Sequence, residues 1–357
     1  MSNNTVGTVD LAEEFREHRS GLQRVQGTLH KYPYLSPLIV LIVAIVVFSL
    51  TSYLKSGEVR FLLPQNISFL TQQTVIVGTL AIAQTLIILT AGIDLSIGAI
   101  MIFGQMVMAN LAVSVTASNV LPIAGQNPAV AILIGILAAV LAGALNGFII
   151  VRFNLPPFIV TLGTFSIFTA ITLILFKART IQGPEIPDLL KVLGNTIKIG
   201  DFQLSYGVIL MLVMFAIFAY ILRSTAWGRH IYAVGDDPAA AELSGISVKR
   251  VLFSVYLVAG LIIGIAAWIT IGRVGSASPN VDPLINLDTI TAVVIGGTSL
   301  FGGRGTLIGT LIGAFIITVV ENGLSLAGLD QAYRVLAIGI LVILAVATDQ
   351  WIRKVKA

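Results

Sequence analysis

Residues 223–250, RSTAWGRHIYAVGDDPAAAELSGISVKR, form a polar segment between two apolar runs that are each long enough to cross a lipid bilayer. Its charged side chains are Arg223, Arg229, Asp236, Asp237, Glu242, Lys249 and Arg250. The small residues at its centre, 239–245, predict a short amphipathic helix followed by a turn. A chain this apolar has few surfaces that a soluble partner can contact, so we expect the polar segment to be a docking site.

The composition indicates an integral membrane protein. The chain has 357 residues, of which 56% are hydrophobic and only 11% are charged, whereas about a quarter of the residues of soluble domains are charged. In a membrane protein, Lys and Arg mainly report topology, so the net charge of +4 does not indicate a nucleic-acid partner. The absence of cysteine excludes disulfides, thiolate chemistry and iron–sulfur clusters.

Apolar runs along the chain predict an all-α, polytopic membrane fold. A span needs about 20 mainly apolar residues. The predicted spans number ten, with nine or eleven as alternatives, and lie at about 36–54, 66–90, 95–116, 128–151, 157–176, 204–222, 251–272, 286–301, 305–323 and 331–349. They form one transmembrane domain at 35–350, between a leader at 1–34 and a C-terminal tail at 351–357.

Charge distribution favours an N-in, C-in orientation. With ten spans both termini lie on one side, and most of the 21 Lys and Arg residues then fall on the cytoplasmic side. This orientation places the polar segment and both terminal segments in the cytoplasm. The outer face then carries the segment 177–203, whose Pro and Gly residues predict an ordered loop with a short helix.

Several classes of function lack their sequence signatures. The phosphate-binding pattern G-x-x-x-x-G-K-[ST] is absent, so the chain cannot itself be an ATPase. The histidines His18, His30 and His230 are scattered, and no set of residues has metal-ligand spacing or forms a catalytic triad. We therefore expect no enzyme activity, no metal and no cofactor bound by this chain. Asp94 and Glu321 fall near span ends, where we expect helix capping or contact with water, and this weakens an ion-driven carrier hypothesis.

Glycine spacing predicts close helix packing. Gly260-x3-Gly264 and the series Gly305, Gly309 and Gly313 place small residues on one helix face. The paired glycines at 296–297 and 302–303 suit irregular backbone that lines a cavity. Polar residues within the spans are candidates for a hydrophilic path, although interhelical hydrogen bonding explains any one of them; the selected set is Gln84, Asn146, Thr161, Thr164, Thr298 and Asn322.

Four ordered segments resemble the membrane permease subunits of bacterial sugar-uptake ABC transporters. They are AGIDLSIGAI (91–100), LPPFIVTLGTFSIF (155–168), AVGDDPAAAELSGISVKRV (233–251) and IGGTSLFGGRGTLIGTLIGAFII (295–317). The chain is most similar to the ribose, xylose and galactose permeases, with branched-chain amino-acid permeases as wider relatives. The resemblance covers about residues 35–350 and implies a multi-pass protein of the bacterial cytoplasmic membrane.

The resemblance also implies a role for the polar segment. Importer permeases carry a short Glu-Ala-Ala-x3-Gly helix that sits in a groove of the ATPase subunit, and Ala239-Ala240-Ala241-x3-Gly245 fits this pattern except for Ala239 in the Glu position. The implied ATPase-coupling residues are Gly235, Asp236, Asp237, Ala239, Ala240, Ala241, Glu242, Ser244 and Gly245.

The same resemblance implies an importer for a monosaccharide or related polyol. Its expected partners are a cytoplasmic ABC ATPase that uses ATP and Mg²⁺, a periplasmic or lipid-anchored sugar-binding protein, a second permease copy and membrane lipid, with no nucleic acid. A branched-chain amino-acid permease and a stand-alone secondary carrier or channel are the alternatives.

Overall fold

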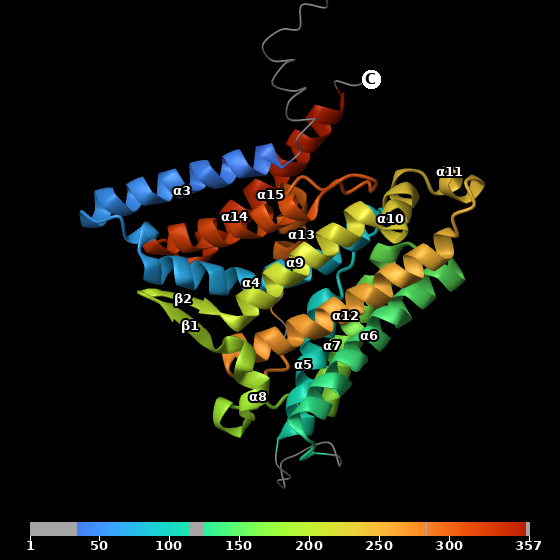
Figure 1. Ribbon diagram of the computed structural model, residues 1–357, viewed down its shortest axis with the longest axis horizontal. Helices are drawn as coiled ribbons and strands as arrows, with labels where there is room; N and C mark the ends of the chain where they lie inside the picture. Colours follow the sequence, from blue (N-terminus) through green and yellow to red (C-terminus); the bar gives the residue numbers. More distant parts are fainter. Residues whose placement is uncertain (1–33, 114–123, 281, 283, 355–357) are drawn as a thin grey trace, which may run out of the picture.

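The protein is a bundle of long apolar helices, shown by a computed structural model that describes residues 34–113, 124–280, 282 and 284–354 (Figure 1). In this part of the chain, seven helices are long and apolar enough to cross a membrane. They are α3 (Leu35–Ser56), α4 (Pro64–Leu89), α6 (Pro128–Phe153), α7 (Pro157–Leu175), α9 (Tyr206–Ser224), α12 (Val248–Val274) and α14 (Leu307–Leu326).

Shorter apolar helical stretches occupy the remaining predicted spans. They are α5 (Ile97–Ala112), α13 (Ile285–Ile295) and the start of α15 (Gln331–Lys354), so each of the ten predicted runs contains one helix. The all-α polytopic membrane fold is therefore confirmed. The number of helices that cross the membrane, the N-in, C-in orientation and the domain limits stay predictions. Residues 1–33 of the predicted leader (1–34) and residues 355–357 of the predicted tail lie outside the described residues.

Two of these helices are too short to cross a bilayer alone. At a rise of 1.5 Å per residue, α5 is about 24 Å long and α13 about 17 Å, whereas the hydrocarbon core is about 30 Å thick. Their N-terminal ends meet inside the bundle, where the Gly98 amide donates a 2.8 Å hydrogen bond to Asn286 Oδ1. In Figure 1 the two helices lie on opposite sides of the bundle centre. They therefore form two shortened helices that converge on one buried point.

Glycines allow the central helices to pack backbone against backbone. A Cβ on Gly260 would lie 2.6 Å from the Ala139 carbonyl oxygen of α6, and one on Gly264 would lie 2.9 Å from Ile136 Cα. On the other side of the bundle, Gly309 and Gly313 of α14 contact the backbone of Gly296 and Ala292. The structure confirms the close helix packing predicted for these four glycines. The prediction was wrong for Gly305, which lies in the loop before α14 and not on its helical face.

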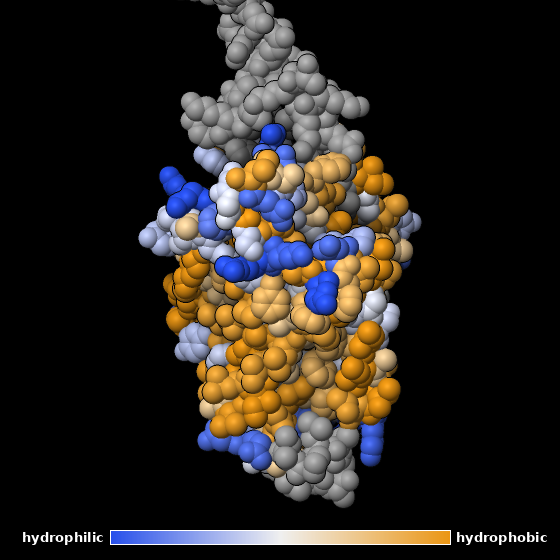
Figure 2. All heavy atoms as spheres, turned by 90° about the vertical axis from the view of Figure 1, so that its right-hand side faces the viewer, coloured by the Kyte–Doolittle hydropathy of each residue, from blue (hydrophilic) through white to orange (hydrophobic). Residues whose placement is uncertain are grey.

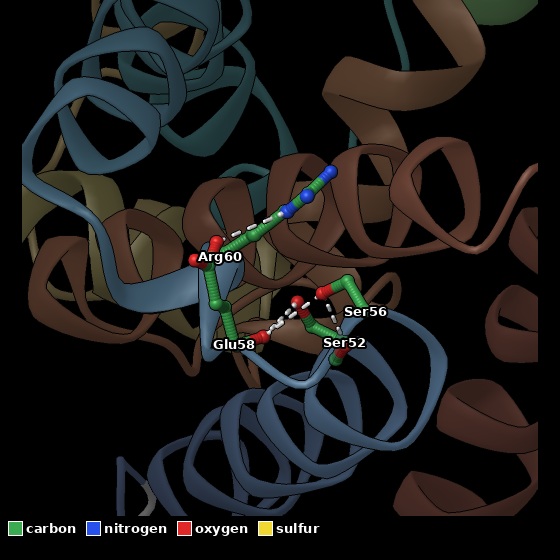
Figure 3. Close-up of polar contacts among 4 residues, drawn as sticks. All are labelled: Ser52, Ser56, Glu58 and Arg60. Carbon is green, nitrogen blue, oxygen red and sulfur yellow. Dashed lines mark hydrogen bonds and ion pairs between the residues drawn. The ribbon is translucent and has the colours of Figure 1, made fainter.

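The connection from α3 to α4 is a tight turn held by hydrogen bonds to main-chain carbonyls. Gly57 ends α3 with φ of 74°, and its amide donates to the Tyr53 carbonyl at 2.8 Å. The hydroxyls of Ser52 and Ser56 both donate to the Glu58 carbonyl at 3.2 Å (Figure 3). The Glu58–Arg60 ion pair is 3.5 Å long and exposed, so it adds little stability. The 3-10 turn η1 (Arg60–Leu62) then leads into α4.

The segment that precedes α9 contains more structure than the sequence analysis predicts. The predicted short helix is present as α8 (Asp188–Lys191), between the 3-10 turns η2 (Gly183–Glu185) and η3 (Val192–Gly194). An antiparallel hairpin follows, formed by β1 (Thr196–Ile199) and β2 (Phe202–Ser205), with Ile197 paired to Leu204. The Gly200-Asp201 dipeptide between two alternating runs is a hairpin signal that the sequence analysis missed.

Candidate functional site

The polar segment folds into two short helices at one end of the bundle. α10 (Ala226–Asp236) follows α9, and α11 (Pro238–Leu243) leads into α12. Since β2 precedes α9 and α10 follows it, the hairpin and the polar segment lie at opposite ends of this helix, as Figure 1 shows. This arrangement agrees with the sequence prediction that 177–203 and 223–250 lie on opposite membrane faces.

α11 is capped at both ends by its own sequence. Asp237 accepts hydrogen bonds from the amides of Ala239 and Ala240 at 2.9 and 3.1 Å, and Pro238 occupies the first helical position. At the other end Gly245 adopts a left-handed conformation, with φ of 81°, and its amide donates to the Glu242 carbonyl at 2.9 Å. The predicted short helix and turn are therefore confirmed.

The exposed face of α11 combines acidic, small and apolar side chains. Among the predicted coupling residues, Asp236, Asp237, Ala239, Ala240, Glu242, Ser244 and Gly245 are exposed. Leu243, which the sequence analysis did not select, is 91% exposed and projects from the same helix. A leucine this exposed outside the apolar belt gains stability when a partner covers it. Its signal in the sequence is a single large apolar residue between Glu242 and Ser244.

Gly235 and Ala241 face inward and attach the polar segment to the membrane helices. Ala241 is buried, and a Cβ on Gly235 would collide with the Leu89 carbonyl oxygen at the end of α4. They therefore cannot contact a docked partner directly.

α10 also packs against the glycine-rich loop 296–305. Tyr232 Oη of α10 donates to the Gly305 carbonyl of this loop at 2.9 Å. The loop is also bonded to the end of α4, where the Gly303 amide donates to the Leu89 carbonyl at 3.0 Å. Burial raises the pKa of the Tyr232 hydroxyl above its ordinary value, so the hydroxyl stays protonated and remains a donor at neutral pH. Because loop 296–305 joins α13 to α14, a displacement of α10 bears directly on both helices.

The six predicted path residues are buried but do not form one continuous row. Asn146 and Thr161 bond to the loop 90–96, and Thr164 bonds to the Thr161 carbonyl within α7. Thr298 lies in loop 296–305, and Asn322 pairs with Asn66 through two hydrogen bonds of 3.0 and 3.1 Å near the far end of α14. Gln84 is fully buried in α4, and its side-chain amide atoms have no partner.

Because Asp94 lies between two predicted spans, we expected it near the surface, but the structure buries it. It is only 2% exposed, because loop 90–96 turns back into the bundle between α4 and α5. Its Oδ1 accepts hydrogen bonds from the amide and the hydroxyl of Ser96 at 2.7 and 2.6 Å. Neither Ser96 nor Asp94 caps α5 with its side chain; Asp94 holds the turn before the helix, and the Gly98 amide in the first turn donates to Asn286 instead. Glu321, by contrast, lies near the end of α14 and is partly exposed.

A buried polar cluster surrounds Asp94. We use this name for Asp94, Ser96, Asn146, Thr161 and Asn286. Asn146 Nδ2 donates to Ser96 Oγ at 2.8 Å, and Thr161 Oγ1 accepts from the Leu95 amide at 3.1 Å. The hydroxyl of Tyr256 and the Oδ1 atom of Asn146 are buried there without hydrogen-bond partners. The cluster therefore holds spare hydrogen-bonding capacity at the junction of the two shortened helices, α5 and α13.

Asn286 joins the two shortened helices, and its loss should destabilise the fold. Its Oδ1 accepts from the Gly98 amide, and its Nδ2 donates to the Leu95 carbonyl at 2.7 Å. Asn286→Leu leaves both buried backbone groups unpaired, at about 1–3 kcal/mol each. We expect a clear fall in the unfolding temperature of the detergent-purified protein.

Asn110→Leu is the matched control for Asn286→Leu. Asn110 is also buried, but among the described residues its side-chain amide donates to the Met106 carbonyl one turn earlier in the same helix, α5, and joins no second helix. Its replacement should therefore have a small effect. Equal losses in the two variants would rule out the bridging role of Asn286.

Residues of catalytic or metal-binding type do not assemble in the described part of the chain. There, no group of three or more His, Cys, Asp or Glu side chains is placed to hold a metal ion. The features with functional geometry are thus an exposed, capped helix at one end and a polar break in the middle of an apolar bundle.

Comparison with known proteins decides the family. The family described as "Branched-chain amino acid transport system / permease component" matches residues 66–346, which include the buried polar cluster, α10, α11 and loop 296–305. The chain belongs to this permease family.

Curated relatives of this permease carry the names of sugar permeases. It is 42% identical to the fructose import permease protein FrcC of Rhizobium meliloti, over 98% of this chain and 94% of the relative. It is 36% identical to the ribose import permease protein RbsC of Bacillus subtilis, over 88% and 92%. The D-allose transport system permease protein AlsC of Escherichia coli is 34% identical, over 82% and 86%. No solved structure matches the permease.

Family membership and the seven long apolar helices together establish the cellular setting. The permease is a multi-pass protein of the bacterial cytoplasmic membrane. On the face that Figure 2 shows, a broad apolar surface lies between hydrophilic residues above and below it. The family is one of transport components, so the polar cluster and the polar segment are sites to be explained by transport.

Proposed function

We propose that the permease is the transmembrane subunit of an ATP-driven importer for a monosaccharide or related polyol. The three relatives named above carry the names of import permeases for fructose and ribose and of a transport system permease for D-allose, and these sugars are neutral polyhydroxy compounds. Coupling to a separate ATPase is supported by the capped, exposed α11, which is attached through α10 to the loop between α13 and α14. In this assembly the permease performs no covalent step, and the partner ATPase uses ATP and Mg²⁺.

α11 is proposed to dock into the ATPase subunit. Its small residues Ala239 and Ala240 permit close approach, and Leu243 supplies an apolar anchor for the partner groove. Three acidic groups, Asp236, Asp237 and Glu242, border this face and give it a negative charge. Acidic side chains therefore lie near Ala239 in the sequence, although the glutamate that the family pattern has at that position is absent.

Docking moves the membrane helices through a short chain of rigid contacts. A shift of α11 moves α10, because Asp237 belongs to both the end of α10 and the cap of α11. α10 is in turn bonded to loop 296–305 through Tyr232 and packed on the end of α4 through Gly235. The ATPase thus biases two arrangements of α4, α13 and α14, which is what alternating access requires.

The proposed path passes the buried polar cluster. Discontinuous helices that meet near mid-membrane mark binding sites in other transporters, because their ends expose polar backbone groups. Here the unpartnered Tyr256 hydroxyl and Asn146 Oδ1 can bond sugar hydroxyls once the helices separate. A second permease copy is proposed to close the path on its open side, with a binding protein delivering substrate from outside.

A branched-chain amino-acid permease is the alternative within the family. Such a substrate needs an anionic partner for its ammonium and a cationic partner for its carboxylate. Asp94 supplies the first, but none of the hydrogen bonds or ion pairs at the described cluster comes from Lys or Arg. A neutral substrate fits this environment better.

Reconstitution tests the proposal against a stand-alone carrier. The permease, purified with its ATPase and binding protein, is placed in liposomes and offered radiolabelled fructose, ribose, allose, galactose and leucine. We expect uptake of one or more sugars only when ATP, the ATPase and the binding protein are all present. Sugar flux through the permease alone would overturn the importer, and uptake of leucine without any sugar would favour the amino-acid alternative.

A further inference from the structure

A surface pocket lies between the ends of α6 and α12 that adjoin the polar segment. Its volume is about 230 Å³, and its lining residues are Phe148, Val151, Arg152, Lys249 and Phe253. Arg152 lies in the last turn of α6, and Lys249 lies in the first turn of α12. Two cationic side chains therefore border a pocket whose other walls are aromatic and aliphatic.

Neither cation is neutralised within the described part of the chain. The ion pairs found there join Arg60 to Glu58, Arg179 to Glu185 and Lys191 to Asp188, and none involves the pocket. No hydrogen bond from the guanidinium of Arg152 or the ammonium of Lys249 to the described protein is present either. Both side chains are exposed. Two unpaired positive charges at one pocket favour an anionic ligand.

The pocket stands at the edge of the apolar belt. Phe148, Leu145 and Leu141 form a row of exposed apolar residues at helical spacing on α6. Phe253, Leu257 and Leu261 form a similar row on α12. Figure 2 shows this side of the molecule, where hydrophilic residues cross the face immediately above a broad apolar surface. A ligand held at the pocket can therefore extend an acyl chain along the two helices.

We infer that this pocket binds the headgroup of an anionic phospholipid. The phosphate lies between Arg152 and Lys249, and the acyl chains lie on the exposed rows of α6 and α12. Basic pockets between membrane helices on the cytoplasmic side suit such headgroups, and a free phosphate would leave the apolar walls and rows uncovered. A phospholipid satisfies both the charge and the apolar surface.

The bound lipid would restrain the junction between α11 and α12. Lys249 is four residues beyond Gly245, so a headgroup that holds Lys249 restrains the start of α12 where α11 joins it. The lipid site does not depend on the proposed ATPase role, since it requires only the pocket, its charges and the membrane.

Native mass spectrometry of the full chain in detergent tests the site. The protein is titrated with palmitoyl-oleoyl phosphatidylglycerol and, separately, with phosphatidylcholine of the same chains. We expect selective binding of phosphatidylglycerol. Since each basic residue near a membrane surface contributes about a fivefold factor, Arg152→Ala with Lys249→Ala should weaken that binding about twenty-five-fold. Unchanged unfolding temperature would show that the double variant is folded.

Arg250→Ala is the matched control, because Arg250 is an exposed cation in the same turn of α12 but does not line the pocket. It should leave selective binding nearly unchanged. An equal loss of phosphatidylglycerol binding in this control and in the double variant would show that general surface charge causes the effect, and it would overturn the site. Equal binding of phosphatidylcholine, or displacement of the lipid by millimolar inorganic phosphate, would likewise overturn an anionic phospholipid site.

Discussion

Gly245→Pro should abolish ATP-driven uptake while the permease still inserts into the membrane and folds. Gly245 has φ of 81°, which proline, held near −65°, cannot adopt. The substitution also removes the amide that donates to the Glu242 carbonyl. The turn that directs α11 away from α12 is therefore lost, and the docking face is misplaced. The measurements are sugar uptake in proteoliposomes and co-purification of the ATPase.

Gly245→Asn is the matched control for the proline variant. Asparagine tolerates the left-handed conformation better than other residues with a side chain, and a Cβ at this position meets no atom within 4 Å. We expect this variant to retain most of the uptake activity. Full uptake by Gly245→Pro would show that the turn has no part in coupling.

Leu243→Asp separates partner contact from backbone geometry. Leu243 touches little of the permease itself, so this change should leave the unfolding temperature unchanged. A buried anchor at a protein interface contributes about 2 kcal/mol or more, so the ATPase should bind at least roughly thirtyfold more weakly. Retained ATPase affinity would remove Leu243 from the proposed interface.

Gly309→Ala should destabilise the bundle severely, and Gly309→Lys should prevent its assembly. A Cβ at Gly309 would collide with the Gly296 carbonyl oxygen, which belongs to rigid backbone at the end of α13. Relief requires α14 to move away from α13, and overpacking of this kind costs about 1–3 kcal/mol even where side chains can adjust. Lysine adds a buried charge to that cost. The measurement is the unfolding temperature and the monodispersity of the detergent-purified protein.

Gly163→Ala provides the control for helix propensity. Gly163 lies in α7, and a Cβ there meets nothing within 4 Å, so alanine should stabilise the helix by about 0.5–1 kcal/mol. The two substitutions are chemically identical but should act in opposite directions. A Gly309→Ala variant as stable as the wild type would contradict the close contact between α13 and α14.

The family and the helix pattern were readable from the sequence because they depend on local information. Hydrophobic run length predicts where apolar helices lie, and the comparisons confirm the resemblance carried by the segments at 91–100, 155–168, 233–251 and 295–317. Asp237, Pro238 and Gly245 define α11 through caps that act within a few residues. The hairpin at 196–205 was equally local, and its Gly200-Asp201 signal was present but missed.

Only the tertiary structure decided which residues face one another. Asp94 reads as a surface turn because its neighbours in sequence are two spans, yet distant Asn146, Thr161 and Asn286 surround its loop and remove it from water. Gly235 and Leu243 belong to one polar segment, but the end of α4 buries the first while nothing in the described chain covers the second. Local chemistry determines where helices begin and end, whereas exposure depends on contacts between residues far apart along the chain.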